Sequence, residues 1–201
     1  MDLLEPIWSQ DKPTDSDVES MWCELEIARE FLQHPAVNDV LHSLRDTHTN
    51  GGAEFAQFRI SAHPAFHWFG SRNRLWEMQF FERFLSSDAV VSSLPELQID
   101  PANLSDPGFQ WGNSLTLDGE IAWLLASGGA YGRFSGTARE AKNLGARFCD
   151  ALFGDRFVEI QVHSSHEPWS PWFHGIAWDS TWLGLDKRLS KVWMLCATDT
   201  D

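Results

Sequence analysis

The alternation of apolar and polar positions is clearest in the last quarter of the chain, residues 156–201. Phe157–His163 alternates with a period of two, which predicts a half-buried strand. Ile176–Asp186 is apolar on both of its faces, as is typical of a strand inside a sheet. Lys191–Thr198 is almost wholly apolar and follows a short polar link, which predicts an antiparallel hairpin.

These strands are expected to form one core with the apolar faces of two helices that contain Val18 and Leu75. The strand residues assigned to that core are Val158, Ile160, Val162, Trp178, Leu183, Val192, Met194 and Leu195.

Apolar spacings of three and four residues predict helices in the rest of the chain. Ser16 and Glu19 form a capping box before a stripe that runs from Val18 to Leu32, and Pro35 suits the first turn of the next helix. Further helices are predicted at Leu75–Leu85, at Leu117–Ser127, and from the Thr137/Glu140 capping box to Gly154. A strand is favoured at Ala53–Ala62. Residues 86–114 are predicted to be irregular surface structure.

The order of these elements predicts a single α+β domain over residues 1–201. Its mainly antiparallel sheet is formed largely by the C-terminal quarter and packs against the N-terminal and central helices, which we expect on one face. No motif in the chain identifies a family.

The net charge of −14 argues against a nucleic-acid backbone or an anionic membrane surface as a ligand, because both require clustered Lys and Arg. The longest clean apolar run, Ile121–Ala126, is too short to span a bilayer. The odd and widely spaced Cys23, Cys149 and Cys196 indicate reduced core cysteines. We therefore expect a soluble cytoplasmic protein.

The acidity is concentrated at the N-terminus, where residues 1–30 hold nine acidic residues against Lys12 and Arg29, a net charge of −7. Glu19, Glu26 and Glu30 are predicted to lie on one helix face and to dock a basic protein partner. The alternative is a charged helix face that is simply solvated.

Two loops are candidate contact surfaces. His166–His174 contains two prolines with Trp169 and Trp172, which are interpreted either as a cover over one end of the sheet or as a recognition loop. Ser127–Gly136, with Tyr131 and Arg133, lacks the lysine of a phosphate-binding loop, so it is interpreted as a helix-to-helix turn able to contact a partner.

No set of residues in the sequence has the spacing of a known metal site or catalytic site. His163, His166, His174 and Asp179 could ligate zinc, but their spacing is not that of a known zinc site, and Pro64 interrupts the helical face that His63 and His67 would need. Ser164 or Ser165 beside His166 and Glu167 lacks the motif of an activated nucleophile, and Thr198–Asp201 is expected to be a solvated terminus. We therefore predict no catalytic residue, metal or cofactor.

The leading hypothesis is a cytoplasmic protein-binding or inhibitory module, possibly an immunity-type protein that neutralises a basic enzyme. The alternative is a small-molecule or metal-dependent enzyme that uses a cleft between the Gly128–Gly136 turn and the His163–His174 loop.

Overall fold

An antiparallel sheet with the strand order β1-β2-β6-β5-β4-β3 forms the centre of the computed structural model, which describes residues 3–201. The strands in these residues are β1 Ile27–Glu30, β2 Gly52–Ile60, β3 Gln110–Trp111, β4 Ile160–Ser165, β5 Ser180–Asp186 and β6 Lys191–Thr198. The α-helices are α1 Asp15–Glu24, α2 Pro35–Thr47, α3 Pro64–Ser71, α4 Phe80–Leu85, α5 Asp88–Ser93, α6 Leu117–Ser127 and α7 Ala138–Phe153. The α+β prediction is confirmed. Asp2, counted in the N-terminal charge, lies outside the described residues.

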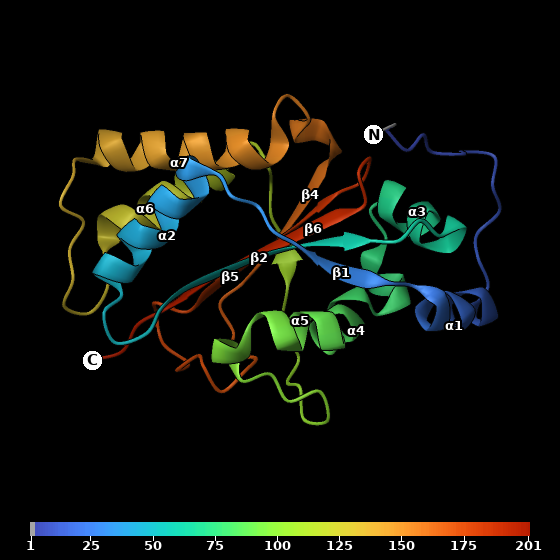
Figure 1. Ribbon diagram of the computed structural model, residues 1–201, viewed down its shortest axis with the longest axis horizontal. Coiled ribbons are helices and arrows are strands. Elements are labelled where there is room, and N and C mark those ends of the chain that lie inside the picture. Colours follow the sequence, from blue (N-terminus) through green and yellow to red (C-terminus); the bar gives the residue numbers. More distant parts are fainter. Residues whose placement is uncertain (1–2) are drawn as a thin grey trace.

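Helices cover both faces of the sheet, so the expectation of helices on one face is wrong (Figure 1). The first core lies under α1, α3, α4 and α5, and the second core lies under α2, α6 and α7. The cause is the apolar character of β5 and β6 on both sides, because each side must be shielded from water.

The predicted single core is accordingly divided. Leu183, Val192 and Met194 pack in the first core with Val18 and Leu75, whereas Ile160, Val162 and Leu195 pack in the second, and Trp178 is only partly buried. Val158 belongs to neither, since a 3₁₀ turn at Phe157–Glu159 precedes β4 and leaves Val158 80% exposed.

The first predicted helix is also shorter than its apolar spacing suggested. Thr14 and Asp17, rather than Ser16 and Glu19, form the capping box of α1, and Leu25 is extended at its end. The following residues form β1, in which Ile27 pairs with Ile60 of β2. Pairing with a neighbouring strand overrides the local helical pattern here.

The predicted helix Leu75–Leu85 is interrupted at Gln79, whose φ of 53° lies in the left-handed region. A 3₁₀ turn, Leu75–Met78, precedes the break and α4 follows it. Similarly, Pro64 does not break a helix but occupies the first turn of α3, and His63 Nδ1 accepts a hydrogen bond from the Ala65 amide at 3.2 Å.

Residues 86–114, predicted to be irregular surface structure, instead contain α5 and bury Val90, Leu94 and Leu97. Other local signals are confirmed. Helix α2 begins at Pro35, α6 has the predicted bounds, and Thr137 with Glu140 caps α7, which ends before Gly154. The hairpin of β5 and β6 has the predicted antiparallel pairing.

Two burial predictions are wrong. Thr198 and Asp199 are fully buried rather than solvated, because backbone amides and a second carboxylate surround them. Cys23 is exposed on α1 rather than buried, whereas Cys149 and Cys196 lie in the core.

Val192 and Val158 offer a matched test of this packing, since they are respectively fully buried and 80% exposed. We expect Val192→Ala to lower the free energy of unfolding by about 2 kcal/mol, and Val158→Ala by less than about 0.5 kcal/mol. Urea denaturation measures both values. Equal losses would contradict the central position of β6.

Candidate functional site: a pocket lined by tryptophan

A pocket of about 440 Å³ opens between α6 and the strands β3, β4 and β5. Its lining includes side chains from all of these elements and from the segments beside them: Trp111, Thr116, Glu120, Trp123, Ser164, His166, Ser180 and Trp182. We call it the tryptophan pocket. Its volume lies in the range of about 300–1,000 Å³ that is usual for sites that bind small groups.

The sheet register brings these residues together. Ser164 and Trp182 are partners in the β4–β5 pairing, so their side chains share one face of the sheet. The apolar face of α6, which includes Ile121 and Leu125, packs on that same face in the second core. Glu120 and Trp123 lie beside this buried stripe and therefore line the pocket.

Glu120 is held in place by two neutral donors. The indole Nε1 of Trp182 donates to Glu120 Oε2 at 2.9 Å, and the Thr116 hydroxyl donates to Glu120 Oε1 at 3.0 Å. Within the described residues no Lys or Arg forms an ion pair with Glu120, because Lys142 pairs instead with Asp118 at 2.8 Å. The pocket thus holds a fixed carboxylate whose charge is not compensated by a basic neighbour.

His166 is oriented by the backbone. Its Nδ1 lies 2.8 Å from the carbonyl oxygen of Asp179 and 3.3 Å from the Ser180 hydroxyl. A carbonyl oxygen can only accept, so the proton of the neutral ring is assigned to Nδ1, which leaves Nε2 as an acceptor.

Two exposed tryptophans line the pocket, and a third packs against one of them. Trp123 is 68% exposed, Trp111 is 53% exposed and Trp76 is 39% exposed. The ring centroids of Trp76 and Trp111 are 4.8 Å apart. We call these three residues the tryptophan surface. Large exposed aromatic side chains that lie together mark interaction sites.

Trp76 and Trp111 also enclose a buried histidine on the opposite face of the sheet. His163 is fully buried, and its ring centroid lies 4.7 Å from that of Trp76, 4.9 Å from Phe81 and 4.6 Å from Trp111. Neither ring nitrogen has a hydrogen-bond partner among residues 3–201. Burial lowers the pKa of His163 to about 4, so the ring is neutral at physiological pH.

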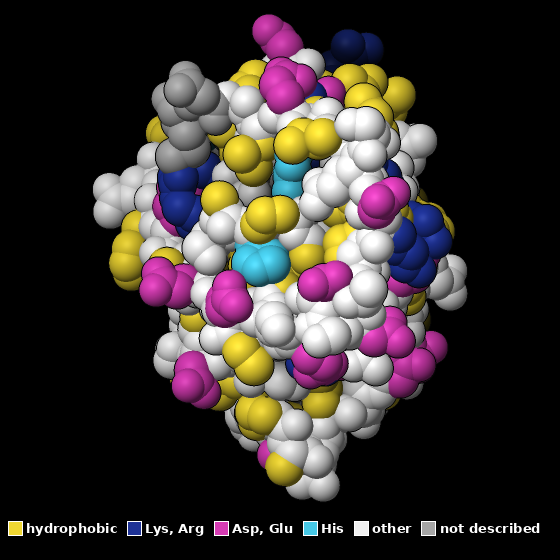
Figure 2. Space-filling model, turned by 90° about the vertical axis from the view of Figure 1, so that its right-hand side faces the viewer, with side chains coloured by type: hydrophobic (Ala, Val, Ile, Leu, Met, Phe, Trp, Pro, Cys, Tyr) yellow, Lys and Arg dark blue, Asp and Glu magenta, His cyan; other side chains and the backbone are white. Residues whose placement is uncertain are grey.

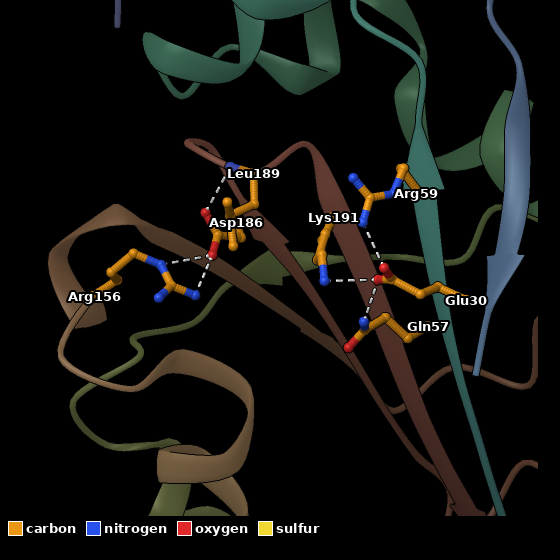
Figure 3. A network of polar contacts seen from close by, with 7 residues as sticks. All are labelled: Glu30, Gln57, Arg59, Arg156, Asp186, Leu189 and Lys191. Carbon is orange, nitrogen blue, oxygen red and sulfur yellow. Dashed lines mark hydrogen bonds and ion pairs between the residues drawn. The ribbon is translucent and has the colours of Figure 1, made fainter. Parts of the chain in front are cut away.

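The sequence-predicted acidic residues do not act as one group. Glu19 pairs with Arg83 of α4, while the Glu26 side chain is exposed. Glu30 lies in a network with Arg59, Gln57 and Lys191 (Figure 3). At the end of the molecule that carries α1 and α3, Asp and Glu side chains are separated by hydrophobic, polar and histidine side chains (Figure 2).

The Glu30 network is part of the sheet rather than a free acidic surface. Arg59 Nη2 and Gln57 Nε2 of β2 each lie 2.6 Å from a carboxylate oxygen of Glu30, and Lys191 Nζ of β6 lies 2.9 Å away. Burial alone would raise the pKa of Glu30, but these hydrogen bonds together outweigh it and lower the pKa to about 2.

The four predicted loop residues lie in different surroundings. Tyr131 is exposed, and the Arg133 guanidinium donates to the Gly132 carbonyl at 3.0 Å. Trp169 is buried in the first core and donates from Nε1 to the Thr181 hydroxyl at 3.0 Å, which supports the interpretation of its loop as a cover. Trp172 is partly buried against Phe173.

Two buried carboxylates tie both predicted contact loops to the end of β6. Asp199 accepts hydrogen bonds from the amides of Asn50 and Ala130 at 2.8 and 2.7 Å. Asp179 accepts from the Gly175 amide at 2.6 Å and from the Thr198 hydroxyl at 2.5 Å. The two loops border different pockets, however, one along α7 and the other the tryptophan pocket.

The predicted zinc ligands do not form a donor set. The His163 ring is enclosed by aromatic rings, His166 Nδ1 is bonded to the Asp179 carbonyl, and the Asp179 carboxylate accepts from the His174 amide at 3.1 Å. Within residues 3–201 no group of three or more His, Cys, Asp or Glu side chains is placed to hold a metal ion.

Sequence reasoning missed Trp111, Glu120 and Trp123 as site residues. One signal was present: Leu117, Ile121, Leu124 and Leu125 form the buried stripe of α6, and Trp123 lies off that stripe. An indole outside the apolar face of an amphipathic helix indicates an exposed contact residue.

No protein-family model matches the chain. No curated protein matches it either. The fold and the site define an α+β protein with helices on both faces of an antiparallel sheet and a pocket lined by tryptophan along one side of α6. None of the helices in the described part of the chain has the length and apolar character to cross a membrane.

Proposed function

We propose that the protein is a cytoplasmic protein-binding or inhibitory module, of the immunity type, that neutralises a basic partner enzyme. The observation that carries the proposal is the tryptophan surface beside Glu120 in a chain of net charge −14. Exposed indoles supply large contact areas at low cost in side-chain entropy, and a negative field accelerates encounter with a cationic partner.

The cytoplasmic assignment is supported by the cysteines. Cys23, Cys149 and Cys196 are free thiols in the structure. Burial raises the pKa of Cys149 and Cys196 to about 12, so both remain protonated and unreactive. Persistent free thiols fit a reducing compartment.

The test compares affinity capture from native cells by the wild type, by Trp123→Ala and by the control Phe31→Ala, which removes an exposed aromatic ring elsewhere (Phe31 is 83% exposed). We expect wild type and control to retain one basic protein in stoichiometric amount, and Trp123→Ala to bind the identified partner at least about tenfold more weakly. The association rate should fall as salt rises.

Two results would contradict the proposal. One is a partner that binds Trp123→Ala as tightly as wild type. The other is the recovery of no basic protein by the wild type in stoichiometric amount. Asp15→Lys with Glu26→Lys tests the steering role of the N-terminal acids better than a change at Glu30, which would break the network with Arg59 and Lys191.

An enzyme acting on a small molecule is the second candidate, and the tautomer of His166 favours it. A histidine held at Nδ1 by a carbonyl presents Nε2 as a general base to the pocket. Incubation with a metabolite extract, in parallel with His166→Ala, tests this candidate. Consumption of a compound by wild type and not by the variant would support it, and unchanged metabolite levels would exclude it for that extract.

A further inference from the structure

We infer that the tryptophan pocket takes the guanidinium group of an arginine side chain of the partner. The inference rests on the proposed function, because a basic partner supplies such side chains. It identifies Glu120 as the residue that recognises the charge and Trp123 as the wall that stacks on the planar group.

The carboxylate of Glu120 is suited to this role because it is both fixed and only half used. A carboxylate offers about four lone-pair sites, and the bonds from Trp182 and Thr116 occupy one on each oxygen. The remaining sites are free to accept the paired N–H groups of a guanidinium. Because Lys142 pairs with Asp118, the negative charge of Glu120 is also available to pair with a cationic ligand.

The wall matches the same ligand. Arginine stacks on indole faces more readily than lysine because its guanidinium is planar and weakly hydrated. Trp123 lines the pocket that contains Glu120, and its side chain is 68% exposed. An aliphatic side chain would pack on this ring equally well but would leave the carboxylate without a partner.

The other polar groups of the pocket are acceptors or can act as acceptors. His166 presents Nε2, and Ser164 and Ser180 present hydroxyl oxygens. A guanidinium has five hydrogen-bond donors and no acceptor, so its donors match the acceptors that line the pocket. A phosphate or carboxylate ligand would instead meet the negative charge of Glu120.

The test is a titration of the whole protein with N-acetyl-arginine methylamide, followed by NMR at the Trp182 indole N–H, which is bonded to Glu120. N-acetyl-citrulline methylamide is the neutral isosteric control. We expect the arginine compound to shift this signal with a Kd on the order of 1 mM, as suits a single side chain, and the citrulline compound to bind at least about tenfold more weakly.

Matched variants separate the pocket from general charge. Glu120→Gln keeps an acceptor for Trp182 and removes the charge, and we expect binding at least about tenfold weaker. Trp123→Ala, at an exposed position, should weaken binding about threefold to tenfold. Glu26→Gln removes the same charge from an exposed side chain elsewhere and should leave the affinity unchanged.

The inference is overturned if the citrulline compound binds as tightly as the arginine compound, or if Glu26→Gln weakens binding as much as Glu120→Gln. These outcomes are distinct from failure of the proposed function. If a partner requires Trp123 but the arginine compound does not bind, the proposed function is supported and the arginine inference is contradicted. If the arginine compound binds but partner capture does not depend on Trp123, the pocket's preference for a guanidinium is supported and the proposed function is contradicted.

Discussion

Replacing Asp179 with alanine is expected to lower the free energy of unfolding by about 4 kcal/mol. The side chain is fully buried and accepts the amides of His174 and Gly175 at 3.1 and 2.6 Å and the Thr198 hydroxyl at 2.5 Å. Each buried donor left without a partner costs about 1–3 kcal/mol, and entering water would offset part of the sum.

Urea denaturation of Asp179→Ala, Asp179→Asn and Asp155→Ala measures this effect. Asp179→Asn keeps one acceptor oxygen but turns an NH₂ group toward donors, so we expect an intermediate loss of about 2–3 kcal/mol. Asp155 is exposed after α7, and its loss should cost less than about 0.5 kcal/mol. Similar stabilities for Asp179→Ala and Asp155→Ala would show that Asp179 does not hold the loop.

Acidification is expected to destabilise the protein through His163, by about 3 kcal/mol in total. The unfolded histidine takes up a proton near its ordinary pKa of 6.5, whereas the folded one does so only near 4. Between these values the unfolded state binds more protons, so stability is complete above about pH 6.5 and is lost as the pH falls toward 4. Each unit of pKa difference is worth about 1.4 kcal/mol.

Chemical denaturation at about pH 7 and about pH 5 measures the effect. Between these pH values the contribution of His163 to stability changes by about 2 kcal/mol. Glu30, with its pKa near 2, stays ionised at both. Burial also lowers the pKa of His48 and His67, so His163→Phe should reduce the pH dependence without abolishing it.

Val162→Ala, a buried change without a titratable group, provides the control, since it should lower stability equally at both pH values. A pH dependence of unfolding that is identical in wild type and His163→Phe would mean that His163 is not the group responsible.

Much of the fold could be predicted because its signals are local. The capping box of Thr137 and Glu140, the proline that opens α2 and the short link between β5 and β6 each act within a few residues. Prediction failed at β1, where pairing with the distant strand β2 replaces a helical pattern, and at Gln79, where a left-handed residue separates a 3₁₀ turn from α4.

The candidate site was less accessible to prediction for the same reason. Trp111, Glu120, His166 and Trp182 come from separate elements, and only the antiparallel register and the packing of α6 bring them together. In the sequence these residues show neither a fixed spacing nor a shared motif. The buried Asp199 escaped prediction because an aspartate that accepts from amides distant in sequence, here those of Asn50 and Ala130, looks like any surface acid.

The place of β6 at the centre of the sheet has a consequence for synthesis. Residues 52–60 have no permanent neighbour on that side until residues 191–198 have been made, because β2 pairs with β6 rather than with any strand between them. During translation the helices of both layers are therefore synthesised before the strand that lies between the layers. Such distant pairing slows folding and leaves apolar strand edges exposed to chaperones in the meantime.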